Sequence, residues 1–149
     1  MDETRAGEQR VAASSSATFG RLQGVNRDLP IHTSRVLVVD DEPAVRALVA
    51  ASLDGAGCEV EACEDGPSAL QSALDTPPQL ILLDVALPGM NGADLLKRLR
   101  AEPATSAVPV VMLTGLEPPA GVHPDGILRK PFAPQDVRET VLEWLGAAS

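Results

Sequence analysis

Short, uninterrupted apolar runs alternate along this chain with segments whose apolar residues recur every three or four positions. The runs 36–39 and 80–83 contain no polar residue, which predicts strands whose two faces are both covered by other elements. Between them, Val45, Val49 and Leu53 recur at helical spacing. Strands that alternate with helices imply parallel βαβ units. The sequence therefore predicts an α/β fold, an open parallel sheet with helices on both of its faces.

The same pattern predicts the individual elements. The strands are expected at 36–39, 58–63, 80–83, 109–113 and 126–129. The helices are expected from Pro43 to before Gly55, from about Ser68 to Leu74, from about Gly92 onward, and from Pro134 to about Leu145. Aromatic residues make up only 2% of the chain, so the core is expected to consist of Val, Leu, Ile and Ala. Cys58 and Cys63, five positions apart in one strand, are expected on opposite faces and without a disulfide between them.

The acidic character of the chain belongs to its folded part. Residues 1–34 show no period and predict a flexible N-terminal tail, followed by one domain at 35–149. The tail contains four arginines and four acidic residues, so the whole net charge of −9 falls on the domain. A domain this acidic repels nucleic acid and anionic membranes and suits protein partners or metal cations. There is no apolar leader and no run of the ~18 apolar residues that a membrane span needs, which predicts a cytoplasmic protein.

Polar side chains follow several of the predicted strands at the point where each one ends. Asp40 and Asp41 follow the first strand, Asp84 the third, Thr114 the fourth and Lys130 the fifth. Ligands of open α/β sheets bind at this edge. Singly, each residue also suits a helix start, a turn or a solvated surface, but all five in this order favour a site. Clustered carboxylates repel one another unless a cation neutralises them, and a site with oxygen ligands alone selects Mg²⁺ or Ca²⁺. With the cation bound, one Asp could act as a nucleophile toward a phosphoryl group.

Four sequence strings occur in the order in which response-regulator receiver domains carry them. They are Val-Val-Asp-Asp-Glu-Pro at 38–43, Leu-Leu-Asp-Val-Ala-Leu-Pro-Gly-Met-Asn-Gly at 82–92, Val-Val-Met-Leu-Thr-Gly at 110–115 and Lys-Pro-Phe at 130–132. Over residues 35–146 the chain therefore resembles a receiver domain of two-component signalling. The resemblance implies a flavodoxin-like sheet of five parallel strands in the order 2-1-3-4-5.

The resemblance also implies a role for each acidic residue of the predicted site. Asp84 would be the phosphoacceptor and would bind Mg²⁺ together with Asp41. The backbone carbonyl of Ala86 would be the third protein ligand of the metal. Asp40 would act through a water molecule or from the second shell around the ion.

The remaining motif residues would contact the phosphoryl group. Thr114 would turn its hydroxyl toward it, and Lys130 would pair first with Asp84 and then with a phosphate oxygen. Gly115 would leave space for the phosphoryl group or its donor. The bond before Pro131 is cis in the family, although an X-Pro bond by itself allows either isomer.

Two features depart from the family pattern. Ile127 stands three positions before the lysine, where many receivers carry an aromatic residue that moves with the threonine. The connection 115–125 between the fourth and fifth strands contains three prolines and Gly121, which disfavour a regular helix. We therefore predict that the fourth helix of the family is short or absent here, and that signal output uses a different or remodelled surface.

The function implied is a phosphorylation switch and not an enzyme in the ordinary sense, since it catalyses only its own phosphorylation and dephosphorylation. The donor would be a phosphohistidine on a histidine kinase or a histidine phosphotransfer protein. The signal would pass to a protein target or along a phosphorelay, and the formation of a homodimer is left open. If the chain is a fragment, an output domain would follow Ser149. The main alternative is a receiver-fold interaction module that works without phosphorylation. A haloacid-dehalogenase-type phosphatase and a flavodoxin-type FMN site fit the motifs less well, because the acid two positions after the nucleophile and the phosphate loop are missing.

Overall fold

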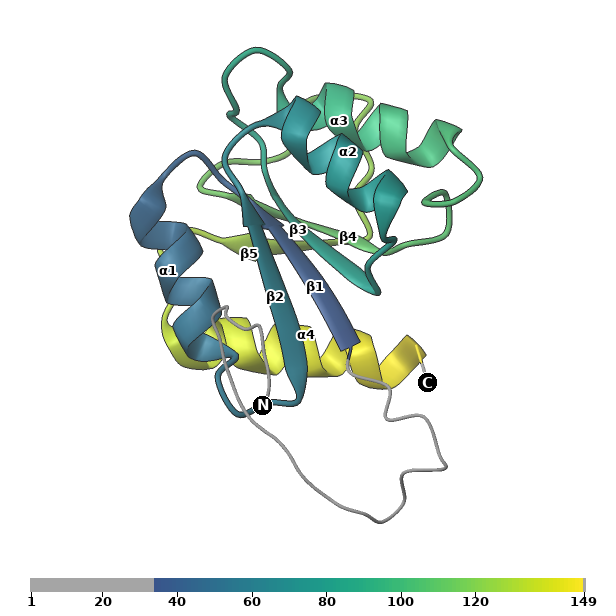
Figure 1. Cartoon of the computed structure of the whole chain (residues 1–149). Helices are drawn as coiled ribbons and strands as arrows, with labels where there is room; N and C mark the ends of the chain where they lie inside the picture. Colours follow the sequence, from purple (N-terminus) through teal and green to yellow (C-terminus); the bar gives the residue numbers. More distant parts are fainter. Residues whose placement is uncertain (1–33, 149) are drawn as a thin grey trace, which may run out of the picture. The chain divides into compact units, whose positions relative to one another are not determined.

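The computed structural model describes residues 34–148, which form a five-stranded sheet flanked by four helices (Figure 1). The strands are β1 (Ser34–Val39), β2 (Cys58–Cys63), β3 (Leu80–Asp84), β4 (Val110–Thr114) and β5 (Gly126–Arg129). The helices are α1 (Pro43–Ser52), α2 (Gly66–Asp75), α3 (Gly92–Ala101) and α4 (Pro134–Ala148). All strand pairs are parallel and their order is β2-β1-β3-β4-β5, which confirms the predicted fold. The predicted tail, 1–34, lies outside the described residues except for Ser34.

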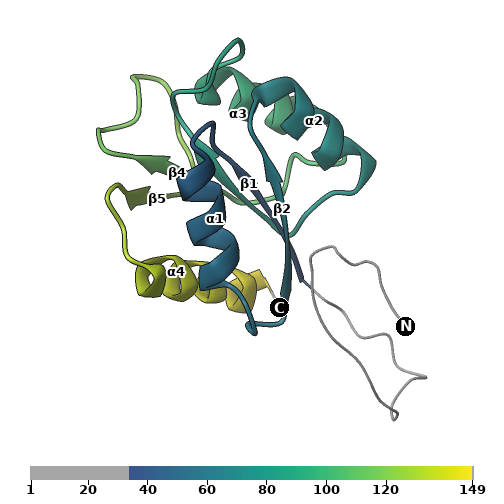
Figure 2. The same ribbon diagram turned by 60° about the vertical axis from the view of Figure 1, so that its left-hand side comes forward.

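The two faces of the sheet carry separate aliphatic cores. Helices α1 and α4 lie on one face and α2 and α3 on the other (Figures 1 and 2). The core under α1 and α4 includes Val36, Val38, Val49, Leu80, Leu82, Val111, Leu113, Val137 and Val141. The core under α2 and α3 includes Leu37, Val39, Leu70, Ile81, Leu83, Leu95, Leu99, Val110 and Met112. Successive residues of one strand belong to different cores, so both faces of the strand must be apolar. This explains the apolar runs without alternation from which the sequence predicted strands covered on both faces. None of the helices described is long and apolar enough to cross a lipid bilayer.

The register of the sheet gathers the strand ends at one edge. The last paired residues of β1 and β3 are Val39 and Leu83, so Asp40 and Asp84 follow them side by side. On the other side of β3, Thr114 ends β4 opposite the last residue of β5, which comes directly before Lys130. Four of the polar residues singled out in the sequence therefore emerge at the same edge.

The two cysteines occupy different sides of the sheet. Cys63 packs against the core under α2 and α3, and Cys58 packs against the core under α1 and α4. This confirms the prediction of opposite faces, and both thiols are free. Burial raises the pKa of Cys58, and burial together with the charge of Glu61 raises the pKa of Cys63 to about 11. Both side chains are therefore protonated thiols at neutral pH.

The connection between β4 and β5 contains no helix: residues 115–125, all of them described, form bends, a turn and irregular chain. This confirms the prediction from the prolines. Asp125 anchors the end of the connection, because its Oδ2 accepts hydrogen bonds from the backbone N–H of Val110 and from Nη2 of Arg100, both at 2.8 Å. No helix covers β5 on the α2–α3 side, and Ile127 is consequently 40% exposed.

A single arginine ties α4 to the end of α1. Nη1 of Arg138 donates hydrogen bonds to the backbone carbonyls of Ser52 and Asp54, both at 3.2 Å. Carbonyls at the end of a helix have no partner inside the helix, so the arginine completes the C-terminus of α1.

We expect Arg138→Met to lower the free energy of unfolding by about 1–2 kcal/mol, because methionine keeps the apolar stem and loses the donors. Urea denaturation followed by circular dichroism measures the change. The control is Arg98→Met, which removes an exposed arginine of α3 that makes no hydrogen bond or ion pair within 34–148. Equal stability of the two variants would show that the contacts of Arg138 contribute nothing.

Candidate functional site

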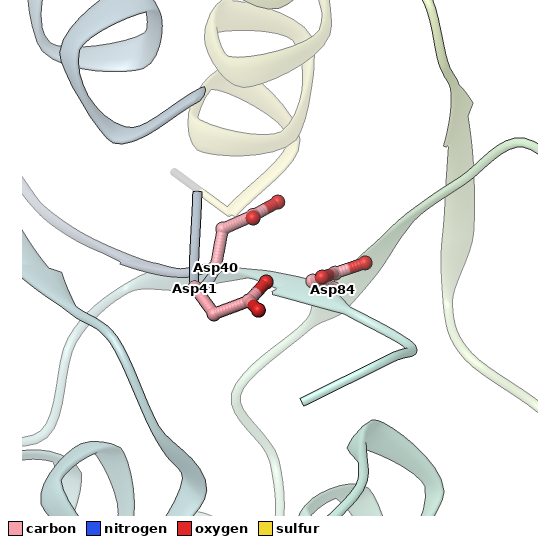
Figure 3. Close-up of side chains that lie close together, drawn as sticks. All are labelled: Asp40, Asp41 and Asp84. Atoms are coloured by element: carbon pink, nitrogen blue, oxygen red, sulfur yellow. The ribbon is translucent and has the colours of Figure 1, made fainter. Parts of the chain in front are cut away.

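Three carboxylates meet at the edge of the sheet where β1 and β3 end. Asp40 and Asp41 follow β1, and Asp84 is the last residue of β3 (Figure 3). One carboxylate oxygen from each residue lies within 4.8 Å of the others. The structure therefore brings together the three acids that the sequence assigned to a metal site.

The first acid of the pair is already fully engaged. Asp40 is buried, its Oδ1 accepts the backbone N–H of Glu42 at 2.9 Å, and its Oδ2 accepts Nζ of Lys130 at 3.0 Å. Asp41 is exposed and makes no hydrogen bond or ion pair with any residue from 34 to 148. Asp41 thus has free oxygens to offer a ligand, whereas Asp40 would have to give up existing contacts.

Lys130 extends its ammonium group into the acidic cluster. Besides Asp40, Nζ contacts Oδ1 of Asp84 at 3.4 Å and Oε1 of Glu42 at 3.5 Å. Burial alone would lower the pKa of Lys130, but the hydrogen bonds and charges of Asp40 and Asp84 outweigh it and raise the pKa. The backbone N–H of Lys130 donates to the carbonyl of Thr114 at 2.9 Å, and the bond to Pro131 is cis, the isomer that the resemblance implied. The acidic neighbours therefore favour the charged form of this ammonium group.

The local field disfavours the charged form of Asp84. Burial, and next the charge of Asp40, raise the pKa of Asp84 above its ordinary value. Lys130 and the backbone N–H of Ala86 act in the opposite direction but do not cancel the effect. An additional cation beside Asp84 would favour its ionised form.

Thr114 and Gly115 lie at the end of β4, the strand next to β3. The hydroxyl of Thr114 is buried; it accepts the backbone N–H of Leu116 at 3.0 Å and donates to the carbonyl of Leu116, also at 3.0 Å. In this structure the hydroxyl thus binds the loop after β4 and not Asp84. A Cβ atom on Gly115 would meet only the carbonyl oxygen of Lys130, at 3.8 Å, so this side of the site is open.

A tight loop after β3 keeps Asp84 at the edge. The backbone N–H of Gly92, the first residue of α3, donates to the carbonyl of Val85 at 2.8 Å. A Cβ atom on Gly92 would overlap the carbonyl oxygen of Asp84 and come within 2.8 Å of Cα of Val85. Gly92 belongs to the second motif of the sequence, but its role could not be predicted, because a close approach between loop and strand leaves no pattern in one sequence.

The chemistry of the donors fits a small divalent cation. The cluster consists of aspartates, which are the hard oxygen ligands that Mg²⁺ and Ca²⁺ prefer. One oxygen from each aspartate lies within 4.8 Å of the others, which suits carboxylates that would share one cation directly or through water. The carboxylates of Asp40, Glu42 and Asp84 contact the single ammonium group of Lys130, and Asp41 belongs to the same acidic cluster, which leaves an excess of negative charge for a cation to neutralise.

A protein-family model described as the response regulator receiver domain matches residues 36–142. The chain belongs to this family. Receiver domains are signalling modules of two-component systems and not classical enzymes. Among curated proteins, the receiver domain is 40% identical over 113 residues to the DNA-binding response regulator MtrA of Mycolicibacterium smegmatis. That alignment covers 69% of this chain and 46% of MtrA, so the chain spans about half the length of the curated relatives it matches.

Solved structures show the same relationship. The receiver domain superposes on the chemotaxis response regulator CheY4 of Vibrio cholerae with a TM-score of 0.71 and 33% identity, covering 76% of this chain and 99% of CheY4. The receiver domain of the sensor histidine kinase PA1611 of Pseudomonas aeruginosa also gives a TM-score of 0.71, at 26% identity over 77% of this chain and 99% of that one. That structure has a magnesium ion coordinated in its active-site cleft.

Proposed function

We propose that this receiver domain accepts a phosphoryl group from a phosphohistidine onto Asp84 in a Mg²⁺-dependent reaction. The observation that carries the proposal is the contact of Lys130 with Asp84 inside a cluster of aspartates at the ends of β1 and β3. A nucleophile, a cation to bind the transferred oxygens and a place for a metal occur together there.

In this mechanism a carboxylate oxygen of Asp84 attacks the phosphorus atom, and the bond from phosphorus to the histidine nitrogen breaks. Bound Mg²⁺ would neutralise negative charge on the oxygens of the transferred group. The ion would be held by Asp41, Asp84 and the backbone carbonyl of Ala86. Lys130 would exchange Asp84 for a phosphoryl oxygen, since both offer an anionic acceptor. Asp40 would position Lys130 and act on the ion through water, because both of its oxygens already have partners.

Residues at the end of β4 would complete the binding of the phosphoryl group. The hydroxyl of Thr114 would leave Leu116 and rotate toward the new oxygens. The open space beside Gly115 suits the incoming donor.

The proposed partners follow from the same chemistry. The donor would be a histidine kinase or a histidine phosphotransfer protein, and the output a protein target, a phosphorelay step or a homodimer. Residues 1–34 would form a flexible tail on a domain at 35–149, located in the cytoplasm. The acidic domain itself is not expected to bind nucleic acid or membranes, whereas DNA binding in relatives such as MtrA belongs to proteins about twice as long.

The alternative, a receiver-fold module that works without phosphorylation, has one observation in its favour. Ile127 is 40% exposed and the helix that would flank it is absent from 115–125, so the aromatic switch of many receivers has no counterpart here. An interaction surface of this kind would not need Asp84 to react.

Labelling by a small phosphodonor separates the two functions. We expect acetyl phosphate to add one phosphoryl group, 80 Da by intact mass, when Mg²⁺ is present and to add none after chelation with EDTA. Adding back Mg²⁺ should restore the label. A protein that stays unlabelled at saturating donor and metal would favour the alternative module.

A further inference from the structure

We propose that Glu42 is a positioning residue that slows phosphoryl transfer, because its ion pair holds the ammonium group of Lys130 among the carboxylates and away from the incoming phosphoryl group. The proposal rests on the function proposed for Asp84 and assigns a role to a residue that the motif comparison leaves without one.

Glu42 is free to contact Lys130 because it does not cap the helix it precedes. It occupies the N-cap of α1 in an extended conformation, with φ −89° and ψ 116°, and its side chain makes no capping hydrogen bond. Only its backbone carbonyl serves the helix, as acceptor for the N–H groups of Val45 and Arg46 at 3.1 and 3.2 Å. The carboxylate instead lies 3.5 Å from Nζ of Lys130.

The ammonium group of Lys130 has little capacity left for a phosphoryl oxygen. An ammonium group has three donors; two are used on Asp40 at 3.0 Å and Asp84 at 3.4 Å, and Glu42 lies on the same group at ion-pair distance. When a phosphoryl oxygen approaches, one of these contacts must be given up.

The three carboxylates differ in how easily they release the lysine. Asp40 is completely buried, and an unpaired buried carboxylate is costly. Asp84 is the proposed nucleophile and lies next to the incoming group. The side chain of Glu42 is 63% exposed, so water replaces Lys130 at low cost. Glu42 is therefore the contact that opens most easily, before Lys130 exchanges Asp84 for the phosphoryl oxygen, and removing Glu42 in advance should make the lysine available sooner.

The expected effect is modest because exposed ion pairs are weak. We expect Glu42→Gln to lower the acetyl phosphate concentration that gives half-maximal labelling rate by about two- to fivefold. The affinity for beryllofluoride, measured by calorimetry with Mg²⁺ present, should rise by a similar factor. The urea midpoint should stay unchanged, since the side chain does not cap α1.

Two further variants separate the contact from the charge. Glu42→Asp keeps the charge, but its shorter side chain suits the N-cap and is expected to turn back to the N–H groups of α1. It should therefore behave like Glu42→Gln. Glu64→Gln removes an exposed acid after β2 that makes no hydrogen bond or ion pair within 34–148, and it should label like the wild type.

Each outcome has one meaning. If the wild type takes no label, the function proposed for Asp84 fails and this inference fails with it. If the wild type is labelled but Glu42→Gln and Glu42→Asp match Glu64→Gln, only the role of Glu42 is overturned. If Glu42→Gln is faster while Glu42→Asp matches the wild type, the effect comes from charge alone, which also overturns the proposed contact with Lys130.

Discussion

Asp84→Asn is expected to abolish labelling by acetyl phosphate, to below about 1% of the wild-type level. The amide has nearly the same shape as the carboxylate and keeps an oxygen for Lys130, but it cannot form the acyl phosphate bond. Intact mass spectrometry after incubation with donor and Mg²⁺ measures the loss.

The folded state of this variant should survive. The pKa of Asp84 is higher in the folded than in the unfolded state. The free energy of unfolding therefore falls as the pH rises from the unfolded pKa to the folded pKa, and above the folded pKa the ionised group keeps its full destabilising effect. Asparagine removes this cost, and the urea midpoint of Asp84→Asn at neutral pH should equal or exceed that of the wild type. Loss of label together with loss of structure would contradict this explanation.

The matched control is Asp54→Asn, which changes an exposed acid after α1 and leaves the site intact. It should label at the wild-type rate. Mg²⁺-dependent labelling of Asp84→Asn at an undiminished level would rule out Asp84 as the acceptor.

Gly92→Ala is expected to lower the free energy of unfolding by about 2–4 kcal/mol. At an ordinary position inside a helix, alanine is more favourable than glycine by up to about 1 kcal/mol. Here the new methyl group would overlap the carbonyl oxygen of Asp84 and approach Cα of Val85 to 2.8 Å. Both neighbours are backbone atoms of β3 and its loop, so the clash is relieved only by moving the residue that carries the proposed chemistry. Urea denaturation gives the change in stability, and the labelling rate should fall with it.

Gly115→Ala is the control for this effect. A Cβ atom at Gly115 meets a single backbone oxygen at 3.8 Å, an ordinary contact, and the unfolding free energy should stay within about 0.5 kcal/mol of the wild type. If Gly92→Ala were as stable as Gly115→Ala, the tight approach of α3 to β3 would not be a requirement of the fold.

The parallel fold and the location of the site were predictable because they depend on patterns that are local in the sequence, whereas the strand order came only from the resemblance to receiver domains. Apolar runs such as 80–83 are typical of strands covered on both sides, and the three prolines in 115–125 disfavour a regular helix there. The residue after each such strand must appear at the carboxyl edge of a parallel sheet. The assignment of Asp40, Asp84 and Thr114 to one edge needed no knowledge of distances.

The roles of Glu42 and Gly92 could not be predicted in the same way. An acid before Pro43 suits a helix start as well as an ion pair, and only the folded chain shows that Glu42 leaves the helix uncapped. The motif around Gly92 indicates a loop, but the sequence does not reveal which backbone atoms the glycine must approach.

The sequence alone therefore determined the parallel α/β fold, the edge at which the polar residues gather and the loss of a helix before β5, since burial, strand direction and proline geometry act over a few neighbouring residues. The tertiary structure alone decided which contacts form at that edge. Lys130 lies 90 residues from Asp40 and 46 from Asp84 along the chain, and whether its ammonium group reaches one, both or also Glu42 depends on strand register and on packing to within an ångström. Distances of that kind follow from the whole core, and no short segment of the sequence contains them.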